Sequence, residues 1–186
     1  MDAIVVEVTR NGITEAEHII SAVVVDERAK VMAFWGDSDM RFYWRSSAKP
    51  FQALPLLATG AADAFGLTDD EIAIACASHH GSIEHQATIK SMLGKAGLDV
   101  NALQCGVHPP MDESERRRLI CSDEKPTPLH HNCSGKHAGM LITAKHLGES
   151  IDNYRLPEHP VQQCILKLAT EFTCYPQLHD TVTSDG

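Results

Sequence analysis

The pattern of apolar residues changes near residue 45, and this change constrains the fold more than any other feature of the chain. Residues 4–9 are rich in β-branched side chains and precede Asn11-Gly12, a pair that favours the tight turn of a β-hairpin. Residues 19–25 and 31–35 flank a charged turn and predict two further strands, and residues 41–44 predict a short one. The first part of the chain is therefore expected to form a meander of strands.

From residue 46 onward the pattern is helical. Ser46 or Ser47 could cap a helix that carries Pro50 in its first turn. The spacing Thr68-x-x-Glu71 is a capping box, which predicts that a helix begins there. Further helices are predicted at residues 83–93, 112–120, 134–147 and 160–172. Strands followed by helices indicate an α/β protein of the layered α+β type, and the lack of repeats and linkers indicates one domain over residues 1–186.

Composition excludes several classes of protein. The chain has 186 residues, of which 43% are hydrophobic, and a formal charge of -9. These values argue against intrinsic disorder and against a nucleic-acid partner, which would need a basic face. The N-terminus lacks the features of a secretory signal, and no apolar run approaches the ~20 residues of a membrane span. Six cysteines without a dense framework are read as reduced thiols, so a cytoplasmic location is expected.

The segment Arg45-Ser46-Ser47-Ala48-Lys49-Pro50 contains the spacing Ser-x-x-Lys. Positions i and i+3 share one face of a helix, so the amine of Lys49 can lie within reach of the hydroxyl of Ser46. A lysine that burial keeps neutral can accept the serine proton and make the oxygen a nucleophile. The spacing is expected roughly 0.7 times by chance in a chain of this length. The alternative is a helix-capping serine and a surface lysine.

The same spacing occurs again at Ser122-Asp123-Glu124-Lys125, just before Pro126. Here the lysine lies beside two carboxylates, so it is expected to be solvated and charged, and this copy is interpreted as a coincidence.

Two further segments carry chemically active side chains. The loop Cys76-Ala77-Ser78-His79-His80-Gly81 follows an apolar run and could display Ser78 in a site. The alternative is that Ser78 caps the next helix and the histidines lie on the surface.

The segment from His130 to His137 is the densest polar cluster of the chain. Its Cys133 and His137 have the i, i+4 spacing of two metal ligands; the alternative is a helix start with a buried thiol.

Together these segments resemble the asparaginase II family, the L-asparaginases of the rhizobial, inducible, zinc-binding type. The motifs that carry the resemblance occur in the family's order and with similar spacing: Arg45-Ser46-x-x-Lys49-Pro50, Cys76-Ala77-Ser78-His79, Cys105-Gly106-x-His108-Pro109, Asn132-Cys133-Ser134-Gly135-Lys136-His137 and Leu156-Pro157-x-His159-Pro160. The resemblance implies hydrolysis of L-asparagine to L-aspartate and ammonia, and a fold related to serine β-lactamases and glutaminases.

The resemblance also implies roles for individual residues. Ser46 would be the nucleophile, Lys49 its base, and Ser78 part of a second Ser–Lys pair. Substrate contacts are expected from Arg45, Asn132 and His137, and zinc ligands from Cys133 and Lys136. The substrate would be a small amino-acid amide, and the full-length protein is expected to be a homodimer.

Family members are longer chains, so the sequence is expected to lack its C-terminal half. Their third zinc ligand is a cysteine directly after the Asp-Gly pair that ends this sequence, and the lysine of the second pair lies farther on. Two alternatives follow: a truncated, inactive remnant of the family, or a small zinc-binding module that uses His130, His131, Cys133 and His137.

Overall fold

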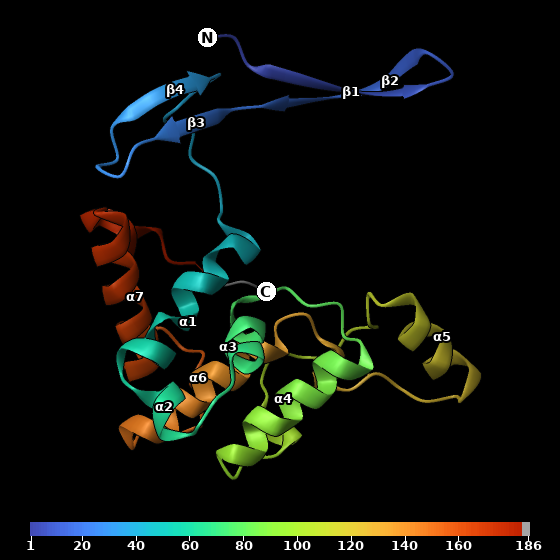
Figure 1. Ribbon diagram of the computed structural model, residues 1–186, viewed down its shortest axis with the longest axis vertical. Coiled ribbons are helices and arrows are strands. Elements are labelled where there is room, and N and C mark those ends of the chain that lie inside the picture. The colour runs from blue at the N-terminus through green and yellow to red at the C-terminus, as the bar shows by residue number, and fades with distance from the viewer. Residues whose placement is uncertain (184–186) are drawn as a thin grey trace. The chain divides into compact units, whose positions relative to one another are not determined.

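The computed structural model describes residues 1–183 (Figure 1). By its internal contacts the chain divides into two compact units, Met1–Trp44 and Arg45–Gly186. The first contains small antiparallel sheets and the second contains helices, so the chain is a mixed α/β protein, as expected. The assignment of the whole chain to one domain stays a prediction.

The first unit consists of two-stranded antiparallel sheets. Strand β1 (Ile4–Arg10) pairs with β2 (Ile13–Ile20), and β3 (Ala22–Val25) pairs with β4 (Val31–Trp35). Asn11 and Gly12 connect β1 and β2 with φ angles of 50° and 78°, the positive values that a two-residue hairpin turn requires. The hairpin prediction is therefore confirmed.

Two strand predictions need correction. The run at residues 19–25 is not one strand, because the chain breaks at Ser21, whose Oγ accepts a hydrogen bond of 3.1 Å from the backbone N–H of Asp37. The strand predicted at residues 41–44 is wrong, because these residues have no regular structure. Gly36 ends β4 at a φ of 69°, and the apolar residues that follow have no neighbouring strand to pair with in this unit.

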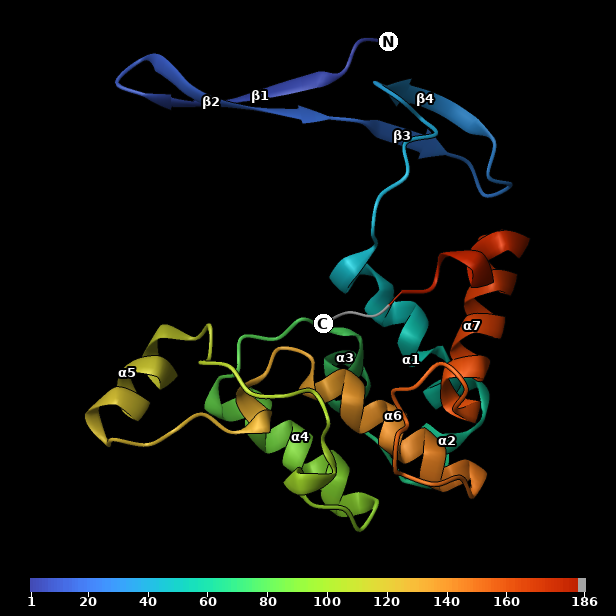
Figure 2. The same ribbon diagram turned by 180° about the vertical axis from the view of Figure 1, so that it is seen from behind.

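The second unit is built from helices, and most of their predicted positions are confirmed (Figure 2). The helices are α1 (Lys49–Ala58), α2 (Ala61–Ala64), α3 (Asp69–Cys76), α4 (Ile83–Lys95), α5 (Glu113–Cys121), α6 (Ser134–Leu147) and α7 (Pro160–Thr173). Short 3-10 turns are η1 (Arg45–Ala48), η2 (Val100–Ala102), η3 (Pro128–His130) and η4 (Pro176–Thr181).

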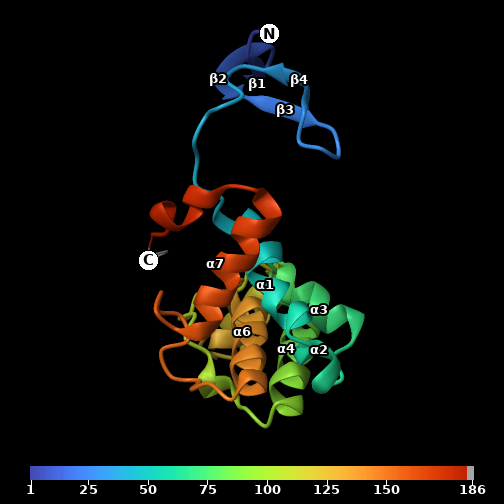
Figure 3. The ribbon, with the colours of Figure 1, turned by 90° about the vertical axis from the view of Figure 1, so that its left-hand side faces the viewer.

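Helix α6 forms the centre of this unit. Its side chains are buried on nearly every face, and α1, α3, α4 and α7 pack against it (Figures 1 and 3). A helix that its neighbours cover on most sides belongs to the core rather than to the surface. Gly135 faces the backbone carbonyl of Ile74, and the lack of a side chain there lets α6 approach α3 closely. The C-terminal end of α3 is thereby held beside the N-terminal end of α6.

Of two predicted helix caps, one is confirmed and the other is wrong. The capping box at Thr68 and Glu71 is confirmed, with the Thr68 N–H donating to Glu71 Oε2 at 2.8 Å. The prediction that Ser46 or Ser47 caps α1 is wrong. Both serines lie in η1, and the cap position is Ala48, which has no side-chain hydrogen bond to offer.

No helix in residues 1–183 combines the length and the apolar character that a membrane crossing requires.

Candidate active site

Three segments of the helical unit bring their polar side chains together. Turn η1 carries Ser46 and leads directly into α1, whose first residue is Lys49. The loop after α3 carries Ser78, and the loop between η3 and α6 carries Asn132. Because α1 and α3 both pack on α6, these three connections meet at one end of the helical core.

A chain of hydrogen bonds links these four residues. Ser46 Oγ lies 3.4 Å from Ser78 Oγ, a long contact for two hydroxyls. Asn132 Nδ2 donates to the same Ser78 oxygen at 3.0 Å. Lys49 Nζ in turn donates to the backbone carbonyl of Asn132 at 3.0 Å. The two serines are exposed, so they lie where a ligand can reach them.

Burial distinguishes the two Ser-x-x-Lys segments. Lys49 is only 2% exposed, although it stands at the start of a helix where a lysine would usually extend into water. Lys125 of the second segment is exposed, as expected. The alternative in which Lys49 is a surface charge is therefore wrong. Burial of an amine disfavours its charged form, which is the condition for a lysine to act as a base.

Asn132 is held from a second side by His108. The Nδ1 atom of His108 contacts the carbonyl of Pro109 at 2.7 Å, and Nε2 accepts the backbone N–H of Asn132 at 3.1 Å. A neutral imidazole satisfies both contacts with its proton on Nδ1. The sequence placed His108 in a motif without giving it a role, and the structure identifies it as a support for Asn132.

The two histidines after Ser78 have different environments. His79 is buried, accepts the N–H of Gly81 at its Nδ1 (3.1 Å), and contacts Ser134 Oγ through Nε2 (2.9 Å). Burial, together with nearby His85, lowers the pKa of His79 to about 3, so the ring is neutral and ties the loop to α6. His80 is exposed. The surface alternative is thus right for His80 and wrong for His79. The alternative in which Ser78 caps the next helix is wrong, because the cap of α4 is Ser82.

The other two residues expected to contact substrate differ in exposure. His137 lies in the first turn of α6, is 8% exposed, and forms a 2.7 Å hydrogen bond with the hydroxyl of Tyr154. Burial lowers the pKa of His137 to about 3, helped by the charge of Lys136. Arg45 is exposed and has a left-handed φ of 49°, directly before Ser46.

The residues expected to bind zinc, Cys133 and Lys136, lie at the start of α6 and are half-buried. They stand one helical turn apart, and a thiolate with a neutral amine is a chemically suitable donor pair for zinc. Cys133 Sγ lies 3.4 Å from Asn132 Oδ1, so this pair adjoins the serines. Residues 1–183 contain no cluster of three or more His, Cys, Asp or Glu side chains suited to a metal. The pair therefore fits as part of a metal site rather than as a complete one.

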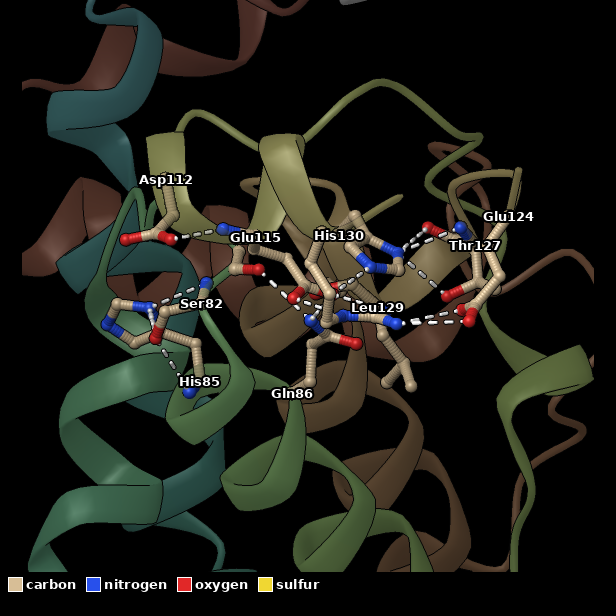
Figure 4. A network of polar contacts seen from close by, with 12 residues as sticks. Ser82, His85, Gln86, Asp112, Glu115, Glu124, Thr127, Leu129 and His130 are labelled. Atoms are coloured by element: carbon tan, nitrogen blue, oxygen red, sulfur yellow. Dashed lines mark hydrogen bonds and ion pairs between the residues drawn. The ribbon is translucent and has the colours of Figure 1, made fainter. Parts of the chain in front are cut away.

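His130, a ligand in the alternative zinc module, is engaged elsewhere (Figure 4). Its Nδ1 accepts the N–H of Thr127 at 2.8 Å, and its Nε2 contacts Glu115 Oε1 at 3.1 Å. Glu115 also binds Gln86 and Arg118, so this buried network connects α5 to α4 and η3. With both ring nitrogens occupied, His130 supports the fold and does not favour a histidine-based metal site.

Tyr154 is the residue that the sequence analysis missed. It is fully buried, and its hydroxyl joins His137 to the backbone N–H of Gln104. It stands outside every motif, between Ile151 and Leu156, and no local pattern distinguishes it from a core aromatic residue.

Comparison with known proteins places these residues in a family. The family model described as L-asparaginase II matches residues 6–186. A search of curated proteins finds no match to the chain.

Proposed function

The chain belongs to the L-asparaginase II family, and we propose that it hydrolyses L-asparagine to L-aspartate and ammonia with Ser46 as nucleophile and Lys49 as base. The observation that carries this proposal is the buried amine of Lys49, which lies one turn from Ser46 and is anchored on Asn132. That anchoring hydrogen bond uses one proton of the amine. The lone pair of a neutral amine is the group that would accept the proton of Ser46.

The reaction proceeds in two steps. Ser46 Oγ attacks the side-chain amide carbon of asparagine while Lys49 takes the hydroxyl proton. The C–N bond breaks, the proton passes from Lys49 to the departing nitrogen, and ammonia leaves an aspartyl ester on Ser46. Water then attacks the ester carbon and gives a proton to Lys49. The ester C–O bond breaks, and the proton returns to Ser46.

The neighbouring side chains have supporting roles in this proposal. Ser78 contacts Ser46 at 3.4 Å and supplies a second hydroxyl for moving a proton. Asn132 fixes Ser78 through its side chain and Lys49 through its carbonyl, so it sets the geometry of both. Arg45 and His137 are the proposed partners of the substrate's carboxylate and amide oxygens.

Cys133 and Lys136 would hold a zinc ion as two of its ligands. Bound there, zinc would polarise the substrate or fix the local geometry, while Ser46 remains the nucleophile. The Lys136 amine must lose its proton to donate a lone pair, so zinc binding by this pair weakens as the pH falls.

Three broader features belong to the same proposal. The fold would be related to serine β-lactamases and glutaminases, the full-length protein would be a homodimer, and the chain would act in the cytoplasm on a small substrate. All six cysteines are free thiols, which supports a reducing compartment.

The test is release of ammonia from L-asparagine by the purified chain, with L-glutamine assayed in parallel. Ammonia and L-aspartate in equal amounts are the expected result. Binding of L-asparagine without any ammonia above the protein-free blank would contradict the proposal and favour the catalytically inactive alternative.

A further inference from the structure

The hydroxyl of Tyr154 stands between two nitrogen atoms. The backbone N–H of Gln104 lies 2.9 Å from it, and Nδ1 of His137 lies 2.7 Å away on another side. An amide N–H can only donate, so the hydroxyl accepts from Gln104. Its single proton is then free to be donated to Nδ1 of His137.

This arrangement selects one form of the His137 ring. Nδ1 must be the acceptor, so the proton of a neutral imidazole sits on Nε2. The charged form would make Tyr154 accept two hydrogen bonds and donate none.

Among residues 1–183, the His137 ring forms a hydrogen bond only with Tyr154, through Nδ1. The Nε2–H donor therefore has no hydrogen-bond partner among these residues. In the same part of the chain, every fully buried side-chain nitrogen or oxygen has a hydrogen-bond partner. Nε2 is therefore the ring nitrogen that remains accessible. His137 lies in the first turn of α6, which begins directly after Asn132 and Cys133, so the ring is at the end of α6 that carries the candidate site.

We infer that Tyr154 is a positioning residue: with the N–H of Gln104, it holds His137 as an Nε2–H donor for a carboxylate or carbonyl oxygen of the ligand. His137 then neither accepts a proton at Nε2 nor binds a metal through Nδ1. The identity of the ligand, L-asparagine, rests on the proposed function, whereas the tautomer does not.

The tautomer can be measured in the intact chain by NMR after labelling the histidines with ¹⁵N. The His137 signals are assigned by their disappearance in His137→Gln. The expected spectrum at neutral pH shows a protonated Nε2 and an unprotonated Nδ1. A protonated Nδ1, in either the other tautomer or the imidazolium, overturns the inference without any mutation of Tyr154.

Tyr154→Phe removes only the hydroxyl, and Tyr175→Phe, at an exposed tyrosine, is the matched control. Loss of the donor should leave His137 as a mixture of tautomers, whereas the control keeps the wild-type spectrum. In the assay, Tyr154→Phe should raise KM for L-asparagine about tenfold and change kcat much less, because His137 no longer holds its Nε2–H toward the bound substrate in every molecule. An unchanged tautomer in folded Tyr154→Phe would overturn the role of Tyr154.

The ligand contact is tested separately by titrating the Ser46→Ala variant with L-asparagine. The expected result is a shift of the His137 Nε2–H signal that saturates with ligand. Binding detected by calorimetry without that shift overturns the donor role. A wild-type chain that binds L-asparagine and shifts Nε2–H but releases no ammonia contradicts the proposed reaction and leaves the role of Tyr154 intact.

Discussion

Lys49 Nζ donates a 3.0 Å hydrogen bond to the backbone carbonyl of Asn132, and this contact joins the first residue of α1 to the loop that enters α6. The two residues are 83 positions apart in sequence. The side chain of Asn132 binds Ser78, so a single residue orients both the amine and the second serine. The site therefore depends on the packing of α1 against α6.

Replacing Lys49 with methionine should remove activity and keep the fold. Methionine retains most of the buried apolar length, while the carbonyl of Asn132 loses one partner, at a cost of about 1–3 kcal/mol in unfolding free energy. Loss of the base should lower kcat for L-asparagine by roughly 10³-fold or more. The control is Lys125→Met, at the exposed lysine of the second Ser-x-x-Lys segment. Near-normal turnover in a folded Lys49→Met chain would exclude Lys49 as the base.

Replacing Ser46 with alanine should abolish turnover with almost no effect on stability. Ser46 is exposed, and its contact with Ser78 at 3.4 Å is long, so the melting temperature should stay within about 1 °C. A lost nucleophile lowers kcat by roughly 10⁴-fold or more. Ser47→Ala is the matched control, because Ser47 is the next residue in η1 and is also exposed. If Ser47→Ala is inactive and Ser46→Ala is active, the nucleophile has been assigned to the wrong serine.

The sequence predicted those features that depend on neighbours along the chain. The bounds of α6 follow from an apolar run with Gly148 directly after it, and Gly148 adopts the left-handed φ of 73° that ends the helix. The capping box at Thr68 and the hairpin turn at Asn11-Gly12 are local in the same sense. The sequence leaves burial of Lys49 open, because it is equally compatible with a surface lysine, and the structure decides for burial.

Contacts between distant segments could not be predicted. The acceptor for Lys49 is a backbone carbonyl, which every residue possesses and no motif identifies. Tyr154 reaches Gln104, 50 positions earlier, only because the intervening helices pack as they do. The strand expected at residues 41–44 shows the same limit, since a strand requires a partner as well as suitable residues.

Zinc binding should be weakened by Lys136→Ala. The half-buried amine is one of two proposed ligands at the start of α6, and removing it leaves only Cys133. Competition with a chromophoric chelator should show at least a tenfold rise in the dissociation constant for Zn²⁺. The comparison is His131→Gln, which removes a ligand of the alternative histidine module. Because His131 Nδ1 accepts the backbone N–H of Cys133 at 3.0 Å, this variant should change the affinity, but much less than Lys136→Ala does. The opposite pattern would favour the histidine module.

Acid should destabilise the helical unit through Glu115. Hydrogen bonds from Arg118, with further ones from Gln86 and His130, lower the pKa of Glu115 from 4.5 to about 2. A carboxyl with a depressed pKa in the folded state contributes stability above pH 4.5, and this contribution is lost as the pH falls toward 2. The shift corresponds to a contribution on the order of 3 kcal/mol.

Urea unfolding between pH 5 and about 2 should reveal this loss. Glu115→Gln should be less stable at neutral pH and should show a flatter dependence on pH in that range. Glu113→Gln, at an exposed position on the same helix, should retain the wild-type slope. Equal slopes for Glu115→Gln and the wild type would show that the network around Glu115 carries no acid sensitivity.

Adding one methyl group at Gly135 should disturb the site from within the core. A Cβ there would overlap the carbonyl oxygen of Ile74, so α6 would have to move away from α3. Overpacking of this kind costs about 1–3 kcal/mol in unfolding free energy, and the shift would separate Ser78, after α3, from Asn132, before α6. Gly94→Ala is the control, because a Cβ at that helical position meets no atom within 4 Å and should stabilise the chain by roughly 0.5–1 kcal/mol. The free energy of unfolding of both variants is measured with denaturant. Equal stabilisation by the two substitutions would show that α3 and α6 do not pack as closely at Gly135 as the structure places them.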